Sequence, residues 1–370
     1  MLFRSIHVTL VPYITSAGEM KTKPTQHSVK NLLELGIQPQ ILVCRSEHPL
    51  DEEIKHKIAS FCNVNNKAVI SAYDCKTIYE VPLVLLKQKF DRLVLKYLKL
   101  PDINIKIDDW TQFVEKIKNP KVKVKIAVCG KYTEVQDAYK SITEAFVHAG
   151  AENIAKVEYV FIRAEDINNK SAVTLLNGFD GILVPGGFGN RGIEGKIAAI
   201  NYARTNKIPF LGICLGMQLA AIEIARNVCG IKSANSSEFV KNKYSIIDLM
   251  ETQKKVSKKG GTMRLGAYPC IIKKDSLAFN AYQETEISER HRHRYEFNNK
   301  YREIFEDNGV LLSGLSPDGN LVEIIELRDH PWFLGCQFHP ELKSRAVKAH
   351  PLFREFIKAA INYSKQGKEN

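Results

Sequence analysis

A cysteine in the second half of the chain has the surroundings of a nucleophile. The segment 208–218 reads IPFLGICLGMQ, an apolar strand, a tight turn and the start of a helix. Cys214 lies in the turn between Gly212 and Gly216, and glycines permit the strained backbone that lifts a nucleophile above a sheet edge. The N–H groups and positive dipole end of the following helix favour a thiolate. The alternative is a buried structural cysteine at a strand end, and the flanking glycines favour the nucleophile.

A histidine and a carboxylate later in the chain supply the base that such a nucleophile needs. The sequence FHPE at 338–341 follows an apolar strand, and His339 and Glu341 stand two residues apart. In extended backbone, this spacing directs both side chains to the same side. Glu341 would orient the imidazole, while His339 exchanges a proton with Cys214 and with a leaving amine. Taken alone, His339 is more often a loop histidine, and the pairing with Cys214 favours catalysis.

A glycine-rich stretch could provide hydrogen-bond donors for a developing oxyanion. Residues 184–192 read VPGGFGNRG, with glycine at 186, 187, 189 and 192. Glycines let backbone N–H groups turn inward, which a tetrahedral oxyanion requires. By itself this stretch could equally be a plain turn or a phosphate loop.

Together, the three pieces resemble class I glutamine amidotransferases in residue types, order and spacing. The resemblance implies a flavodoxin-like α/β fold and attack of Cys214 on the side-chain amide of glutamine. Ammonia would leave toward a second active site, and a glutamyl thioester would be hydrolysed. The family positions for glutamine fall on Gly187, Leu215, Gly216, Met217, Gln218, Glu238 and Arg294. A carboxylate and an arginine suit the two charged ends of an amino acid.

Four further segments resemble the CTP synthase family, and the resemblance covers nearly the whole chain. They read MKTKPTQHS at 20–28, NSSEF at 235–239, GGTMRLG at 260–266 and ERHRHRYE at 289–296. Without the family, the RHRHR run would be interpreted as a solvated basic turn, and Lys21 and Lys23 as surface lysines. The loop that holds these two lysines is suited to binding phosphate oxygens, because the loop adjoins the start of a helix.

The family resemblance implies ATP-dependent amination of UTP to CTP, with ammonia from L-glutamine displacing phosphate from O4. UTP, and CTP as feedback inhibitor, would contact Lys21, Thr22, Lys23, Pro24, Thr25, Gln26 and Lys57. The ATP adenine would border Tyr73, Asp74 and Cys75. The family also implies GTP as an allosteric activator, with Arg264 as a candidate contact, and a homotetramer.

One expected motif is missing. The family normally begins with a glycine-rich phosphate loop and acidic Mg²⁺ ligands, and no G-x-x-x-x-G-K or close variant occurs before residue 20. We therefore expect a truncated P-loop-type synthetase domain, with the Mg²⁺ ligands for ATP in a missing N-terminal segment. Three hypotheses follow: a CTP synthase acting with that segment, a stand-alone glutaminase, and a non-catalytic remnant that needs a partner chain.

Composition restricts the class of protein further. The 370 residues are 44% apolar and 25% charged, which is typical of a globular chain with two domains. Eight cysteines without a C-x-x-C pair indicate reduced thiols in a cytoplasmic protein and no metal site. The net charge of +12 is spread diffusely, so we expect no nucleic-acid partner. No apolar run is long enough for a membrane span.

Strands alternate with helices, so the chain should form two α/β domains with mainly parallel sheets. Residues 1–100 would form the C-terminal part of a synthetase domain, 101–121 a linker, and 122–365 the amidotransferase domain. In the first domain we predict strands at 6–11, 40–44 and 68–71, and helices at 27–35, 51–61, 78–88 and 91–98. In the second we predict strands at 123–129, 157–162, 181–184, 209–213 and 334–338, and helices at 138–149, 195–204 and 217–227. Residues 365–370 would be a frayed tail.

Overall fold

The computed structural model describes residues 4–131, 136–240, 242–249 and 263–369. Contacts divide the chain into two compact units, 1–114 and 115–370. The division falls inside helix α5 (Asp108–Lys118), which lies in the stretch predicted as the linker. Across the described ranges, every helix is too short or too polar to span a membrane.

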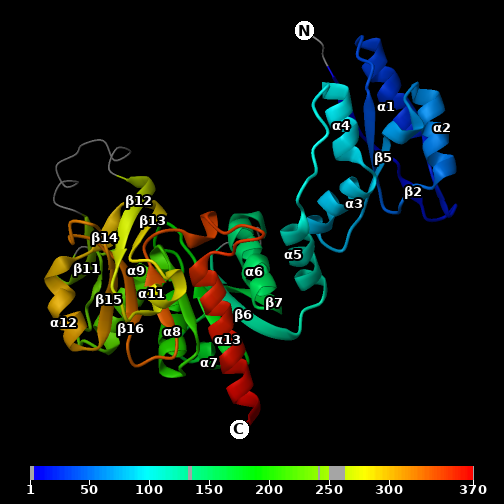
Figure 1. The fold of residues 1–370 in the computed structure, drawn as a ribbon. Coiled ribbons are helices and arrows are strands. Elements are labelled where there is room, and N and C mark those ends of the chain that lie inside the picture. Colours follow the sequence, from blue (N-terminus) through cyan, green and yellow to red (C-terminus); the bar gives the residue numbers. More distant parts are fainter. Residues whose placement is uncertain (1–3, 132–135, 241, 250–262, 370) are drawn as a thin grey trace. The chain divides into compact units, whose positions relative to one another are not determined.

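The first unit is a three-layered α/β structure. Its three-stranded sheet is parallel throughout, in the order β1-β4-β5. Helices α1 and α2 cover one face around Leu42 and Cys44, while α3 and α4 cover the other around Ile41 and Ile70 (Figure 1). The elements are β1 (Ile6–Leu10), β2 (Tyr13–Ile14), β3 (Glu19–Met20), α1 (Lys23–Glu34), β4 (Ile41–Ser46), α2 (Glu52–Cys62), η1 (Asn66–Ala68), β5 (Val69–Tyr73), η2 (Ile78–Glu80), α3 (Val81–Lys87) and α4 (Phe90–Leu98).

The second unit is built on a nine-stranded sheet in the order β13-β12-β15-β16-β17-β9-β8-β6-β7. Strands β17, β9, β8, β6 and β7 are parallel, and the pairs from β17 out to β13 are antiparallel. A smaller sheet joins β10, β11 and β14. The strands are β6 (Val122–Gly130), β7 (Ala155–Arg163), β8 (Gly181–Val184), β9 (Phe210–Ile213), β10 (Asn235–Ser236), β11 (Ser245–Leu249), β12 (Arg264–Ile272), β13 (Glu286–His293), β14 (Tyr295–Phe297), β15 (Val310–Leu315), β16 (Val322–Leu327) and β17 (Phe333–Cys336).

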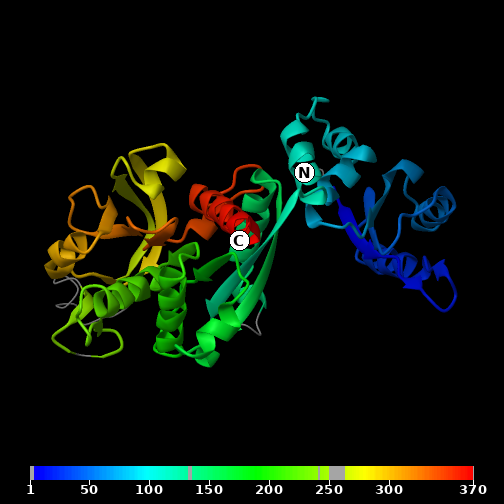
Figure 2. The same ribbon diagram turned by 90° about the horizontal axis from the view of Figure 1, so that it is seen from below.

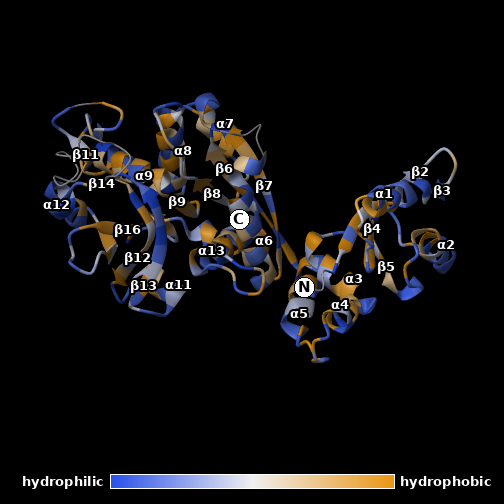
Figure 3. Ribbon diagram, turned by 90° about the horizontal axis from the view of Figure 1, so that it is seen from above, coloured by the Kyte–Doolittle hydropathy of each residue, from blue (hydrophilic) through white to orange (hydrophobic). Residues whose placement is uncertain are grey.

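Helices pack on both faces of this large sheet, as the two views of Figures 1 and 2 show. Residues of α7, α8, α9 and α12 form one core with the sheet, and residues of α6, α11 and α13 form the other. The central strands are hydrophobic (Figure 3), and every residue of β8 and β9 is buried. The helices are η3 (Gln136–Tyr139), α6 (Lys140–Glu152), η4 (Ala164–Asp166), α7 (Ser171–Leu176), α8 (Ile193–Thr205), α9 (Leu215–Asn227), α11 (Leu277–Tyr282), η6 (Asn299–Tyr301), α12 (Arg302–Asp307), η7 (Pro340–Leu342) and α13 (Pro351–Glu369).

The predicted α/β fold class is confirmed, and each predicted strand and helix of the parallel regions has a counterpart. Three differences remain. Helix α1 begins at Lys23 rather than at 27, because Pro24 fits the first turn, where its missing N–H costs nothing. Helix α13 continues to Glu369, so the tail predicted from 365 is helical up to that residue. The antiparallel half of the large sheet lies outside the predicted parallel pattern.

Candidate active site

Cys214 lies at a strained turn between β9 and α9. Its φ of 51° and ψ of −102° are unusual for a residue with a side chain. A Cβ on Gly216 would lie 2.1 Å from the carbonyl oxygen of Val184, and a Cβ on Gly212 would lie 2.8 Å from the carbonyl carbon of Gly216. The start of α9 therefore packs directly against backbone, and glycine is required on both sides of the cysteine. The elbow predicted from sequence has the corresponding geometry.

His339 and Glu341 follow the end of β17 and lie next to each other. Nδ1 of His339 lies 2.7 Å from Oε1 of Glu341, and both side chains are mostly buried. The backbone here is not extended as predicted, because Pro340–Leu342 forms the 3₁₀ helix η7. This turn still places the two side chains together. The backbone N–H of His339 donates to the carbonyl oxygen of Arg290 (2.8 Å), which ties the segment to β13.

The charged form of His339 is strongly favoured. Burial opposes protonation, but hydrogen-bonding and charge interactions with Cys214 and Glu341 outweigh it and raise the pKa of His339 to about 10. With Nδ1 directed at Glu341, the other ring nitrogen, Nε2, is buried and makes no hydrogen bond of ordinary geometry. An imidazolium next to the sulfur can donate a proton from this nitrogen to a leaving group.

The glycine-rich loop runs beside these groups. A Cβ on Gly186 would lie 2.9 Å from Cε1 of His339 and 3.5 Å from Cβ of Cys214. Nζ of Lys131, a residue that the sequence analysis missed, donates to the carbonyl oxygens of Phe188 (2.7 Å) and Gly189 (2.9 Å). Those carbonyls are therefore held on the side of Lys131, which fixes the conformation of the loop.

A cavity of about 160 Å³ opens at the sulfur. Of the residues predicted to contact glutamine, Gly187, Gln218, Glu238 and Arg294 line it, together with Cys214. Leu215, Gly216 and Met217 do not line it, because they form the buried first turn of α9. The lining residues that were not predicted are Phe188, Met263, His293 and Tyr295.

Two opposite charges stand in this cavity. Burial raises the pKa of Glu238, while the N–H of Gly189 and the charges of Lys131 and Arg294 oppose that shift. Glu238 and Arg294 thus offer one acidic and one basic group within reach of Cys214. Residues 260–262 of the predicted GGTMRLG segment lie outside the described residues.

The RHRHR run is a strand rather than a solvated turn. In β13 the residues Ile287, Glu289, His291 and His293 are buried, and the side chains between them are exposed. Burial, then the charge of Arg264, lowers the pKa of His291 to about 2 and that of His293 to about 3, so both rings are neutral.

Arg264 belongs to the same buried cluster. Its guanidinium lies 3.2 Å from Glu296 and 2.8 Å from Glu323. Only 7% of the residue is exposed. The side chain that the family resemblance linked to GTP is therefore engaged inside the protein.

The residues predicted for UTP gather near the start of α1 in the first unit. Lys21 pairs with Glu19, and the charge of Lys57 from α2 also lowers the pKa of Glu19. Thr25 is buried, and its hydroxyl donates to the carbonyl oxygen of Leu10 (2.9 Å). The amide of Gln26 donates to the hydroxyl of Thr22 (3.1 Å), Lys23 is exposed, and Pro24 lies in the first turn of the helix.

The residues predicted for ATP follow the carboxyl end of β5. Asp74 pairs with Arg45 of β4 (2.6 Å), and the thiol of Cys75 lies 3.5 Å from the carbonyl oxygen of Tyr73. Ligands of open parallel sheets commonly bind at this edge. In the described ranges, no group of three or more His, Cys, Asp or Glu residues is placed to hold a metal ion.

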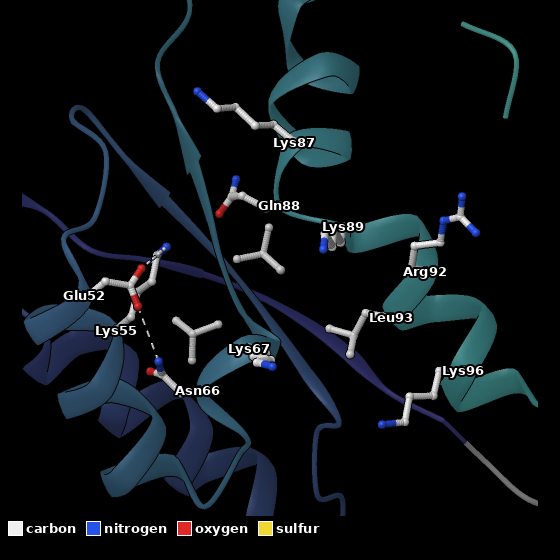
Figure 4. A pocket seen from close by; sticks show the side chains of 12 residues that line it. Glu52, Lys55, Asn66, Lys67, Lys87, Gln88, Lys89, Arg92, Leu93 and Lys96 are labelled. Carbon is white, nitrogen blue, oxygen red and sulfur yellow. Dashed lines mark hydrogen bonds and ion pairs between the residues drawn. The ribbon is translucent and has the colours of Figure 1, made fainter. Parts of the chain in front are cut away.

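A larger cavity of about 540 Å³ lies along β5 in the first unit, and the sequence analysis missed it. Six of its side chains are cationic and one is acidic (Figure 4). This excess of positive charge attracts anions. None of the residues predicted for UTP or ATP lines it. The twelve lining residues are Glu52, Lys55, Asn66, Lys67, Val69, Ile70, Lys87, Gln88, Lys89, Arg92, Leu93 and Lys96.

Comparisons with known proteins agree with the fold and the site. Residues 134–359 match the family described as glutamine amidotransferase class-I, and residues 2–100 match the family described as CTP synthase N-terminus. The CTP synthase of Chlorobium phaeobacteroides (strain BS1) is 61% identical over 361 residues, which cover 96% of this chain and 64% of that protein. The CTP synthase of Caldanaerobacter subterraneus subsp. tengcongensis is 56% identical over 358 residues, covering 96% and 67%.

A solved structure covers the second unit. The glutaminase domain of Trypanosoma brucei CTPS with bound acivicin is 36% identical, with a TM-score of 0.61 over 65% of this chain and 94% of that one. Fold and family match make the second unit a class I glutamine amidotransferase domain. With the match of the first unit, the chain belongs to the CTP synthase family. It spans 64% and 67% of the lengths of the two bacterial relatives.

Proposed function

We propose that the second unit hydrolyses L-glutamine and that the ammonia serves the ATP-dependent amination of UTP to CTP. The observation that carries this proposal is the grouping of Cys214, His339 and Glu341 beside a cavity of about 160 Å³ that also holds Glu238 and Arg294. The identity to CTP synthases supports the nucleotide half.

In the proposed mechanism, the thiolate of Cys214 attacks the side-chain amide carbon of glutamine. The oxyanion of the tetrahedral intermediate accepts hydrogen bonds from backbone N–H groups of the glycine-rich loop and of the start of α9. The imidazolium of His339 gives its proton to the leaving nitrogen, and ammonia departs. Water then attacks the glutamyl thioester, His339 takes a proton from that water, and glutamate leaves as the thiolate is restored.

Glutamine would be held by its charged ends. Glu238 suits the α-ammonium and Arg294 suits the α-carboxylate, and the cavity is small enough to select a ligand of amino-acid size. Gly187 and Gln218 border the same space. The backbone of Leu215, Gly216 and Met217 contributes the helix end behind the sulfur.

The first unit would contribute part of the nucleotide sites. Lys21–Gln26 and Lys57 would contact the phosphates of UTP and of CTP as feedback inhibitor, and Tyr73–Cys75 would border the adenine of ATP. We also propose GTP as an activator, a homotetramer and a cytoplasmic location. The family supports all three, and the eight unpaired cysteines support the last. A second candidate is a stand-alone glutaminase, which the triad and cavity of the second unit favour because both lie wholly within that unit.

The test is release of glutamate and ammonia from glutamine by the purified chain and by Cys214→Ala. The variant should be inactive, because no other side chain replaces the thiolate. Synthesis from free ammonia by a full-length relative with the same change should continue. Full glutaminase activity in Cys214→Ala would overturn the proposal. For the nucleotide half, Lys21→Ala and Lys23→Ala should weaken UTP binding and leave glutamine affinity unchanged.

A further inference from the structure

One amide next to the nucleophile belongs neither to the triad nor to the predicted glutamine contacts. Gln337 follows β17 directly, precedes Phe338 and His339, and is fully buried. Its Nε2 atom lies 3.7 Å from Sγ of Cys214. Its backbone N–H donates to the carbonyl oxygen of Glu323 (2.8 Å), so the residue is anchored to β16.

The orientation of this amide follows from its neighbours, although oxygen and nitrogen of an amide are told apart only by their partners. Gln218 places one amide atom 3.0 Å from the carbonyl oxygen of Tyr295. That oxygen can only accept, so the atom of Gln218 is its NH₂ group. The same NH₂ lies 3.1 Å from the amide of Gln337 and must donate to its oxygen. The NH₂ group of Gln337 therefore faces the sulfur of Cys214.

We propose that Gln337 is a further catalytic residue, whose amide donates a hydrogen bond to the Cys214 sulfur and stabilises the thiolate. The inference rests on the proposed glutaminase activity. In the thiol form, the S–H group can donate to the carbonyl oxygen of Arg292, at 3.9 Å. After ionisation, the sulfur accepts from Gln337 and from the imidazolium of His339. The bond with Gln337 strengthens again when the thioester C–S bond breaks and negative charge returns to sulfur.

The amide is held so that it cannot turn away. Its oxygen accepts from Gln218, and the Tyr295 carbonyl that fixes Gln218 also accepts from Nδ1 of His293 (3.2 Å). Donor and sulfur are thus positioned before substrate binds, which is the arrangement that electrostatic stabilisation requires.

Two substitutions separate donation from a purely structural role. Gln337→Glu keeps the size and the acceptor for Gln218 but replaces the donor to sulfur. Gln337→Met keeps the size and removes both. Ser313→Ala is the matched control, because it removes another fully buried hydrogen bond of the same sheet, from Ser313 to Glu326 (2.7 Å).

The readouts are the rate of Cys214 alkylation by iodoacetamide from pH 6 to 10, kcat and KM for glutamine, and the thermal midpoint. We expect both Gln337 variants to be alkylated more slowly at neutral pH and to lose roughly tenfold in kcat, with KM little changed. Ser313→Ala should keep wild-type rates. The variants alter none of the other titratable or charged groups around the sulfur, which are His339 and Glu341 at η7, His293 and Arg294 near β14, Glu238, and Cys336 of β17.

Wild-type alkylation and kcat in folded Gln337→Glu would overturn the inference and leave the proposed function intact. A wild-type chain without glutaminase activity would overturn the proposed function. The alkylation rates would still test the contact of the Gln337 amide with the Cys214 sulfur. If the first two variants fail to fold, Gln337→Asn replaces them, because its shorter amide cannot reach the sulfur. An unchanged alkylation rate in that variant would also overturn the inference.

Discussion

The triad residues differ in what each contributes, and the contacts give an order of importance. In the proposed mechanism, Cys214 forms the covalent bond and His339 moves the proton, while Glu341 acts through its 2.7 Å contact with the histidine. We expect His339→Ala to lose nearly as much glutaminase activity as Cys214→Ala. Glu341→Gln should lose less, because the amide can still orient the ring. Steady-state kinetics measures both, and wild-type rates in the two variants would place the base elsewhere.

Protonation of His339 also links the site to stability. Its pKa is about 10 in the folded chain and about 6.5 in an unfolded one. Because the folded value is raised, the stabilisation is fully present below pH 6.5 and is lost as the pH rises through 10. We expect Glu341→Gln to unfold at lower urea than the wild type at pH 6, with the difference narrowing toward pH 10. A difference that grows with pH would contradict the assignment.

The sequence predicts the triad because its members stand in short, distinctive segments. The supporting residues are harder to predict. Lys131 donates to the glycine-rich loop, and the amide of Gln337 lies next to the sulfur of Cys214. Both contacts join residues far apart in the sequence, so no local pattern predicts them. Gln337 directly precedes the FHPE segment, and that adjacency was the available signal.

At the scale of elements, the turn from β9 to α9 depends on backbone packed against backbone. A Cβ on Gly216 would lie 2.1 Å from the Val184 carbonyl oxygen, while a Cβ on Gly187 would meet atoms at 3.6 Å and beyond. We expect Gly216→Ala to lower the free energy of unfolding by roughly 3 kcal/mol, because either strand β8 or helix α9 must shift to make room for the methyl group. Gly187→Ala should change it by less than about 0.5 kcal/mol. Urea unfolding compares the two, and equal stabilities would show that the elbow tolerates a side chain.

The central parallel strands β8 and β9 were predictable because every residue in them is buried, so they appear as apolar runs. The antiparallel half was not, and β13 shows why. Its buried positions include Glu289, His291 and His293, so a strand with an alternating burial pattern looks polar in the sequence. The contacts of Arg264 with Glu296 and Glu323 satisfy part of this polarity within the protein. Because most of these buried positions are polar, the strand shows no hydrophobic period in the sequence.

At the scale of the whole molecule, the two units differ in how completely helices cover their sheets. The second has a covered sheet, a triad and a cavity of its own. In the first, Ile6, Val8 and Leu10 of β1 are 45%, 62% and 58% exposed. Their partners Ile41 and Val43 share this face and pack in the core with α3 and α4, so the helical cover stops short of the edge strand β1.

This difference leads to a prediction for the isolated 370-residue chain. Phosphoryl transfer from ATP requires a phosphate-binding element and Mg²⁺ to neutralise charge, and these residues include no G-x-x-x-x-G-K motif. We expect slow glutamine hydrolysis and no CTP from UTP, ATP and ammonia, measured by chromatography of the nucleotides.

We also expect self-association through β1, because an uncovered apolar strand at a sheet edge can pair with another chain. Replacing Val8 and Leu10 with Thr should reduce light scattering and leave glutaminase activity unchanged, whereas Val347→Thr, at an exposed position in the second unit, should change neither. Robust ammonia-dependent CTP formation by this chain would show that its own residues bind and activate the ATP phosphates. Scattering equal in all three proteins would show that the exposed face of β1 is not the contact.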